Sequence, residues 1–180
     1  VMSKCPFGVR VEDAIAPVLK KLGANIDFKL EFIADPLPDG TFKALHGQPE
    51  VEGNIAQLCA IKHHPDTFMD LVSCMNKNMR DIPNNWESCA QQAKLDMEKM
   101  KSCFSGEEGK ALHKASSELA KKKGARGSPT IFFNGQRYSG GRSETSFTRA
   151  VCNAFKGTQP PACGELPPPV AVNLTIITDK

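Results

Sequence analysis

Ser3-Lys4-Cys5-Pro6-Phe7-Gly8 is the stretch from which the rest of this 180-residue sequence can be interpreted. Pro6 suits the first position of a helix, because its missing N–H would have no partner there anyway. The helical pattern that follows ends at Leu22, before Gly23. Cys5 then occupies the N-cap, where unpaired N–H groups and the positive end of the helix dipole stabilise a thiolate. The stretch therefore predicts a nucleophilic cysteine at the start of a helix.

The composition indicates a globular chain from an oxidising compartment. Apolar residues make up 40% and charged residues 24% of the sequence, as in ordinary globular domains. The net charge of +3 is mild, and apart from Lys121-Lys122-Lys123 the basic residues are scattered, so no nucleic-acid partner is expected. No apolar run approaches the length of a membrane span. Seven cysteines are many for a cytosolic chain, so we expect an extracytoplasmic location: the periplasm, the secreted space or an endomembrane lumen.

The first half of the chain alternates between strand-like and helical patterns. Bulky and charged side chains alternate over residues 27–34, which predicts a strand with one buried face. Helical patterns then fill most of residues 50–123. Helix starts within this region are predicted at Asp66, Asn85 and Asp96.

The second half returns to short strands. A buried strand is expected over residues 130–134, followed by a type I′ hairpin turn at Asn134-Gly135. A last amphipathic helix is expected over residues 143–155, capped by Ser143 or Glu144. Residues 170–178 are again strand-like.

The predicted order is strand, helix, strand, helical insert, strand, strand, helix. It resembles the α/β thioredoxin-like fold with a helical insertion that DsbA-like proteins have. Residues 1–163 would then form one thioredoxin-like domain, with the insert at about 50–123. Residues 164–180 would be a proline-rich linker and a strand, and could begin a second domain of a chain that has been trimmed.

Two signatures resemble the active site of that fold. Cys5-Pro6-Phe7-Gly8 is similar to the Cys-Pro-x-Cys of thiol oxidoreductases, with Gly8 in place of the second cysteine. Ser128-Pro129 stands before the strand at 130–134, where the fold places a cis-proline that faces the catalytic cysteine. The resemblance implies that the backbone of Ser128 is free to pair with a substrate chain.

Further motifs resemble the gamma-interferon-inducible lysosomal thiol reductase family. Its signature, Cys-Gln-His-Gly-x2-Glu-Cys-x2-Asn-x4-Cys, is matched at His46, Gly47, Glu50, Asn54 and Cys59. Ala44 and Val51 replace its two other cysteines, as expected if a disulfide was lost as a unit. Residues 102–112 are similar to the family's Cys-x-x-Gly-x-x-Gly-x-x-Leu, and residues 151–163 to its Val-Cys-x3-Gly segment and closing cysteine.

The resemblance implies thiol–disulfide exchange with protein disulfides. Cys5 would be the catalytic nucleophile, and the substrate would contact Pro6, Phe7, Gly8, Ser128 and Pro129. With one thiol in the motif, release of the mixed disulfide needs a resolving thiol from a small molecule or a second redox domain. The alternative is a degenerate module that binds polypeptides or a partner protein without turnover, which a buried Cys5 would favour.

The other six cysteines are expected in structural disulfides, and neither a metal nor a cofactor is predicted. Cys152 and Cys163 close a short loop and should pair. Three pairings are open to the remaining cysteines, among them Cys74–Cys89 with Cys59–Cys103. His63 lies one helical turn from Cys59, but no third and fourth metal ligands are evident.

The signature residues themselves allow two interpretations. His46 and Glu50 could orient a substrate or act as a base. Alternatively, His46 and Gly47 shape the start of a helix, and Asn54 forms hydrogen bonds to a loop.

Overall fold

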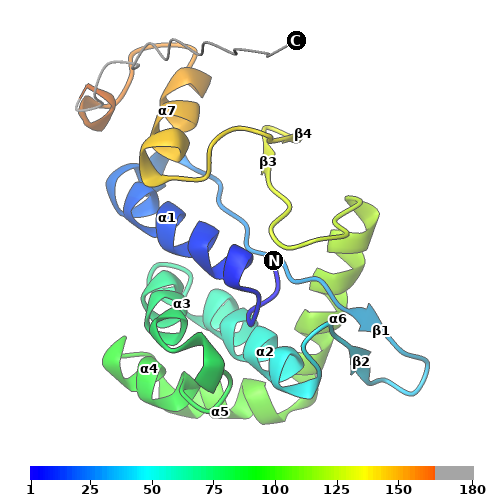
Figure 1. Ribbon diagram of the computed structural model, residues 1–180. Helices are drawn as coiled ribbons and strands as arrows, with labels where there is room; N and C mark the ends of the chain where they lie inside the picture. The colour runs from blue at the N-terminus through cyan, green and yellow to red at the C-terminus, as the bar shows by residue number, and fades with distance from the viewer. Residues whose placement is uncertain (165–180) are drawn as a thin grey trace, which may run out of the picture.

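The computed structural model describes residues 1–164, and helices dominate them (Figure 1). The α-helices are α1 (Pro6–Leu22), α2 (Gln48–His63), α3 (Phe68–Lys77), α4 (Trp86–Gln92), α5 (Met97–Ser105), α6 (Glu107–Lys122) and α7 (Glu144–Ala154). Short 3-10 turns are at Gly23–Asn25, Met79–Asp81 and Pro161–Cys163. Within the described residues, no helix has the length and apolar character needed to cross a membrane. The strand expected over residues 170–178 lies outside the described part.

Most helices begin where their local signals predict. Pro6 opens α1 with Cys5 as its N-cap, and Asn85 is the N-cap of α4. The side chain of Asp96 caps α5 by accepting from two backbone amides of its first turn. Ser143, the first of the two expected caps, accepts from the amide of Ser146 at the start of α7.

The start predicted at Asp66 is wrong, because α3 begins at Phe68. The chain makes a tight turn after α2, in which the amides of Thr67 and Phe68 both donate to the carbonyl of His64. Asp66 therefore lies inside the turn, and Thr67 is the N-cap.

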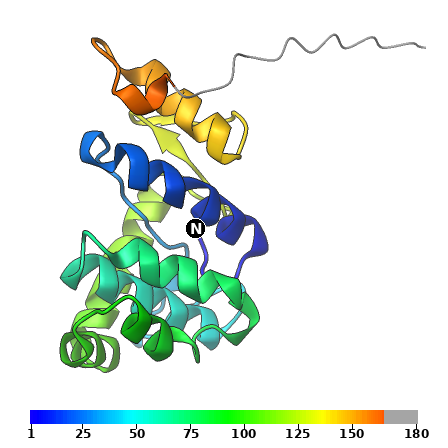
Figure 2. The same cartoon turned by 90° about the vertical axis from the view of Figure 1, so that its left-hand side faces the viewer.

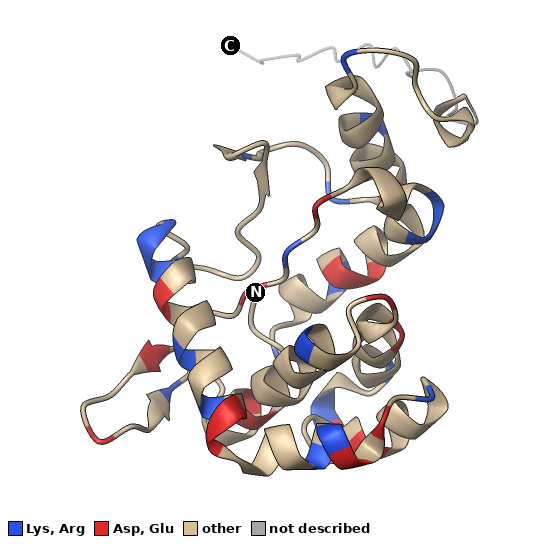
Figure 3. Ribbon diagram, turned by 180° about the vertical axis from the view of Figure 1, so that it is seen from behind, with Lys and Arg blue, Asp and Glu red and all other residues tan. Residues whose placement is uncertain are grey.

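Helix α1 lies between α7 on one side and the helices of the insert on the other (Figures 1 and 2). The insert packs α2 against α5 and α6, and its buried side chains form the largest apolar cluster in the described part. A second cluster joins α1 to α7 through Val18, Leu22 and Phe147. Lysine, arginine and acidic residues are interspersed over these helices in Figure 3.

Residues 27–34 do not form the predicted strand, although the predicted alternation holds. Leu30, Phe32 and Ala34 are buried, and Lys29 is exposed. The backbone amides of this segment form hydrogen bonds with groups outside any assigned strand. The Phe32 amide donates to Ser116 Oγ at 2.8 Å, and the Ile33 amide donates to the Val1 carbonyl at 2.8 Å. Only the next residues pair, as β1 (Asp35–Pro36) against β2 (Phe42–Lys43).

The hairpin forms as predicted, but its first strand is short and partly exposed. Asn134 and Gly135 have φ of +47° and +79°, the positive pair that a type I′ turn requires. They join β3 (Phe132–Phe133) to β4 (Gln136–Arg137). The expectation of a buried strand over 130–134 is wrong, because β3 has a pairing partner on one edge only and Phe132 is 37% exposed.

The strands of the described part thus form two separate antiparallel pairs. A cavity of about 600 Å³ lies between residues 26–31 and 130–135, and α1 and α7 also line it. The helices expected over most of residues 50–123 are present as α2 to α6, whereas residues 1–164 hold only these two short strand pairs as sheet.

Candidate functional site

Cys5 is a free cysteine held at the N-cap of α1. Its backbone is extended, its amide donates to the Met2 carbonyl at 3.0 Å, and its carbonyl accepts from the Val9 amide. Its thiol faces the Ser128 carbonyl oxygen, 3.6 Å from Sγ. The side chain is only 7% exposed, so the sulfur lies just beneath the surface.

The loop at Ser128-Pro129 lies beside the first turn of α1, although the two are more than 120 residues apart in sequence. The Ser128–Pro129 peptide is cis. Ser128 Oγ accepts from the Met2 amide at 3.0 Å, and its carbonyl accepts from Cys5. The structure therefore brings together the two segments that sequence analysis paired. The roles of Pro6, Phe7, Gly8, Ser128 and Pro129 in substrate binding stay predictions.

Phe7 is the exposed apolar residue of this site. Its ring is 61% exposed, and the guanidinium of Arg10 lies 5.9 Å from its centroid. Exposed aromatic side chains next to a buried thiol offer a contact surface for an apolar part of a substrate.

The space that a side chain at Gly8 would occupy is already filled. A Cβ at this position would lie 2.5 Å from Ser128 Oγ and 3.3 Å from the Met2 carbonyl oxygen. A residue here must therefore displace the Ser128 hydroxyl, which also accepts from the Met2 amide. Gly8 and Ser128 are sterically coupled across the site.

We expect a double-mutant cycle of Gly8→Cys and Ser128→Ala to be non-additive. Gly8→Cys alone should destabilise the fold by about 1–3 kcal/mol, because the new Cβ forces the hydroxyl away. Ser128→Ala alone leaves the Met2 amide without its acceptor, at a cost of about 1–3 kcal/mol. The double variant should lose less stability than the two single variants added together. Without the Ser128 hydroxyl the Cβ at position 8 no longer clashes with it, and the hydrogen bond of the Met2 amide is lost only once. Urea unfolding of the four proteins measures the coupling, and strict additivity would contradict the arrangement.

The signature residues lie directly against the segment that leads to Cys5. Glu50 and Asn54, both on α2 and both fully buried, accept from the backbone amides of Lys4 and Ser3. His46 Nδ1 forms a hydrogen bond with Glu50 Oε2. The position of His46 and the bond from Asn54 to a loop agree with the second interpretation of these residues. Sequence reasoning missed which loop is bound, because its residues are about 50 positions away.

Three disulfides use the other six cysteines. They are Cys59–Cys103, Cys74–Cys89 and Cys152–Cys163. The first joins α2 to α5, the second α3 to α4, and the third holds the end of α7 to the turn at Pro161–Cys163.

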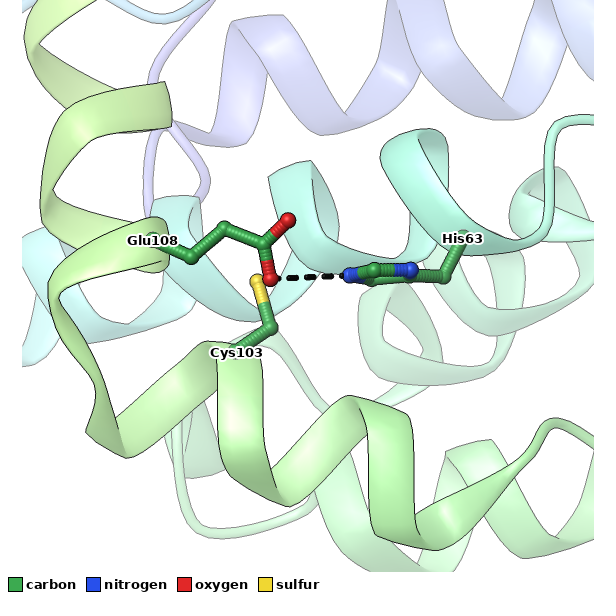
Figure 4. Close-up of side chains that lie close together, drawn as sticks. All are labelled: His63, Cys103 and Glu108. Atoms are coloured by element: carbon green, nitrogen blue, oxygen red, sulfur yellow. Dashed lines mark hydrogen bonds and ion pairs between the residues drawn. The ribbon is translucent and has the colours of Figure 1, made fainter.

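His63, Cys103 and Glu108 form a cluster whose candidate ligand atoms lie within 4.8 Å of one another (Figure 4). His63 Nε2 and Glu108 Oε2 are 3.0 Å apart. The Cys103 sulfur is bonded to Cys59, so it offers no thiolate, and metal sites use cysteine as the thiolate. The cluster is therefore an ion-pairing group beside a disulfide.

Two buried titratable residues were not foreseen from the sequence. Burial raises the pKa of Glu12 on α1 to about 7, even though Asn76 Nδ2 donates to its Oε2 at 2.9 Å, which lowers it. Burial lowers the pKa of His113 on α6 to about 4. The signal for Glu12 was available, because it lies three residues from Val9 and from Ile15 on the apolar face of α1.

Two comparisons with known proteins bear on the family of this chain. The family model described as gamma interferon inducible lysosomal thiol reductase (GILT) matches residues 1–93. The gamma-interferon-inducible lysosomal thiol reductase of Carassius auratus is 28% identical over 131 residues, which are 69% of this chain and 52% of that protein. The chain thus spans about half the length of this relative. Since the matched region holds Cys5 and the signature residues of α2 and is more than half of the sequence, the chain belongs to the GILT family of thiol reductases.

Proposed function

We propose that this protein is a thiol reductase that acts on protein disulfides through Cys5 alone, on a thioredoxin-like fold with a helical insertion. The observation that carries the proposal is a free cysteine at the N-cap of α1, with Sγ 3.6 Å from the Ser128 carbonyl, in a chain of the GILT family. The thiolate of a cysteine is its nucleophilic form.

The exchange proceeds in three steps. The Cys5 thiolate attacks one sulfur of a substrate disulfide, forming a mixed disulfide and releasing the other sulfur as a thiolate. Gly8 carries no thiol, and the other six cysteines are paired. An external thiol, such as glutathione or a thiol of a second redox domain, therefore attacks the Cys5 sulfur of the mixed disulfide. This forms a disulfide between Cys5 and the external thiol, and the substrate leaves with both of its sulfurs reduced. A second equivalent of that thiol regenerates Cys5 and leaves as the oxidised thiol.

An extracytoplasmic compartment suits this chemistry. Three disulfides persist only where the surroundings are oxidising. The relative from Carassius auratus is named as a lysosomal protein. We propose the same type of compartment for this chain.

One observation favours the alternative, a module that binds polypeptides without turnover. Cys5 is 7% exposed, so a disulfide substrate reaches Sγ only if the residues around Phe7 or the loop at Ser128 move aside. Under this alternative the same surface binds a chain, and the thiol stays unreacted.

The test is adduct formation with a small peptide dimer that is linked by one disulfide. Native protein should gain the mass of one peptide at Cys5, and added glutathione should remove it. Cys5→Ser should abolish the adduct entirely.

The two functions predict different results. A protein that binds the peptide, shown by fluorescence anisotropy, but forms no adduct until it is denatured would support the binding module. Mass spectrometry of the intact protein, without reductant, distinguishes the two.

A further inference from the structure

We propose that Glu50 and Asn54 are positioning residues for Cys5. This inference rests on the proposed function. Helix α2 fixes the backbone of residues 3–4 and thereby sets where the Cys5 sulfur lies.

The direct contacts form a continuous set. The Ser3 amide donates to Asn54 Oδ1 at 3.1 Å, and the Lys4 amide donates to Glu50 Oε2 at 3.3 Å. Ser3 Oγ also donates to the Glu50 carbonyl at 3.2 Å. Ser3, Glu50 and Asn54 are fully buried, so water cannot replace these bonds.

Close packing reinforces the bonds. A Cβ at Gly53, between the two acceptors on α2, would lie 2.6 Å from Ser3 Oγ and would also clash with Ile82 Cγ2. The segment thus rests against the bare backbone of α2. The Lys4 ammonium donates to three carbonyls near Met79–Asp81, including that of Arg80 at 3.0 Å, which anchors the same segment from its other side.

Each acceptor is itself held. His46 contacts the Glu50 carboxylate with both its ring and its amide, the amide at 3.3 Å from Oε1. The Asn54 side-chain amide donates to His113 Nε2 at 3.1 Å, which orients Oδ1 toward Ser3. Four residues from α2, α6 and the loop before α2 therefore hold two peptide groups.

The position of the sulfur depends on this segment. Cys5 follows Lys4 directly, and within the described residues its thiol bonds only to the Ser128 carbonyl. Contacts of the Cys5 side chain therefore do little to hold Sγ. The backbone that precedes Cys5 determines the distance of Sγ from the N–H groups of the first turn of α1. A displacement of about 1 Å is enough to change reaction rates by about a hundredfold.

The experiment compares wild type with Glu50→Ala, Glu50→Gln, Asn54→Ala and, as control, Glu52→Ala. The Glu50→Gln variant keeps an oxygen acceptor for the Lys4 amide, whereas the Glu52 carboxylate accepts, among residues 1–164, only from Gln48 on the surface. Three measurements are made on each 180-residue chain: amide exchange by mass spectrometry, adduct formation with the peptide disulfide at pH 6, and the rate of Cys5 alkylation by iodoacetamide at pH 6.

We expect Glu50→Ala and Asn54→Ala to speed amide exchange in residues 1–5 while leaving α4 and α7, which do not pack on α2, unchanged. Adduct formation should slow about tenfold, because the Cys5 sulfur is displaced from the position in which it meets the substrate disulfide. Alkylation of Cys5 should not become faster. Glu50→Gln should recover most of the rate, and Glu52→Ala should match wild type.

Three results would overturn the proposal. Faster exchange in residues 1–5 with an unchanged rate of adduct formation would show that the bonds do not position the thiol. Faster exchange throughout the chain, with faster alkylation of a newly exposed Cys5, would show that these residues only stabilise the fold. Unchanged exchange in residues 1–5 would show that the bonds do not hold the segment. If wild type forms no adduct, the proposed function fails, but exchange and alkylation still decide the positioning role.

Discussion

Replacing Cys59 and Cys103 together with alanine is expected to lower the free energy of unfolding by about 4 kcal/mol. This disulfide closes a span of 44 residues, and a cross-link over a longer span removes more conformational freedom from the unfolded chain. Both cysteines are fully buried in the cluster of the insert, so the lost sulfur atoms also leave unfilled space. The variant should therefore unfold at much lower urea concentration.

The pair Cys152–Cys163 is the matched comparison, because it spans only 11 residues and lies at the end of α7. Its removal should cost about 3 kcal/mol, less than removal of the first. Urea unfolding without reductant measures both. An equal or smaller loss for Cys59 and Cys103 would mean that the insert does not depend on this cross-link.

Glu12→Gln is expected to stabilise the protein above pH 7 and to leave it unchanged near pH 4.5. The pKa of Glu12 is raised from 4.5 to about 7 by burial, so the folded protein holds a proton that the unfolded chain releases. The contribution of Glu12 to the free energy of unfolding is fully present below pH 4.5 and is lost as the pH rises through 7. The shift corresponds to about 3 kcal/mol. Glutamine keeps an oxygen that can accept from Asn76 but cannot ionise.

The contribution of His113 to stability changes with pH in the direction opposite to that of Glu12 over much of the same pH interval. Its pKa is lowered from 6.5 to about 4, so its contribution is present above pH 6.5 and is lost as the pH falls through 4. Between pH 4.5 and 6.5 the two contributions change in opposite directions and by similar amounts. Wild type should therefore show a nearly flat profile there, and Glu12→Gln should expose the loss caused by His113.

Unfolding free energies from pH 4 to 8 test this expectation. The exposed Glu118, which pairs with Lys114 on the same face of α6, offers a control in Glu118→Gln. The control should follow wild type at every pH. A constant difference between Glu12→Gln and wild type, independent of pH, would contradict the raised pKa.

The sequence by itself determined the features that depend on near neighbours in the chain. Pro6 after Cys5 predicted the start of α1, Asp96 and Ser143 predicted two caps, and Asn134-Gly135 predicted the hairpin turn. Each signal acts within about four residues, through a missing N–H, a capping oxygen or a positive φ. Family motifs with characteristic spacing indicated the GILT resemblance for the same reason, since spacing is read directly from the chain.

Only the tertiary structure decided the contacts between distant segments. The alternation of residues 27–34 predicted their buried face correctly but not their hydrogen-bond partners, which come from Val1 and Ser116 rather than from a strand. Likewise, no local pattern shows that Ser128 fills the space beside Gly8, or that Asn54 holds the amide of Ser3. Periodicity specifies which face of a segment is buried, whereas the partner it meets depends on how the whole chain packs, and the surroundings of Cys5 are set by such partners.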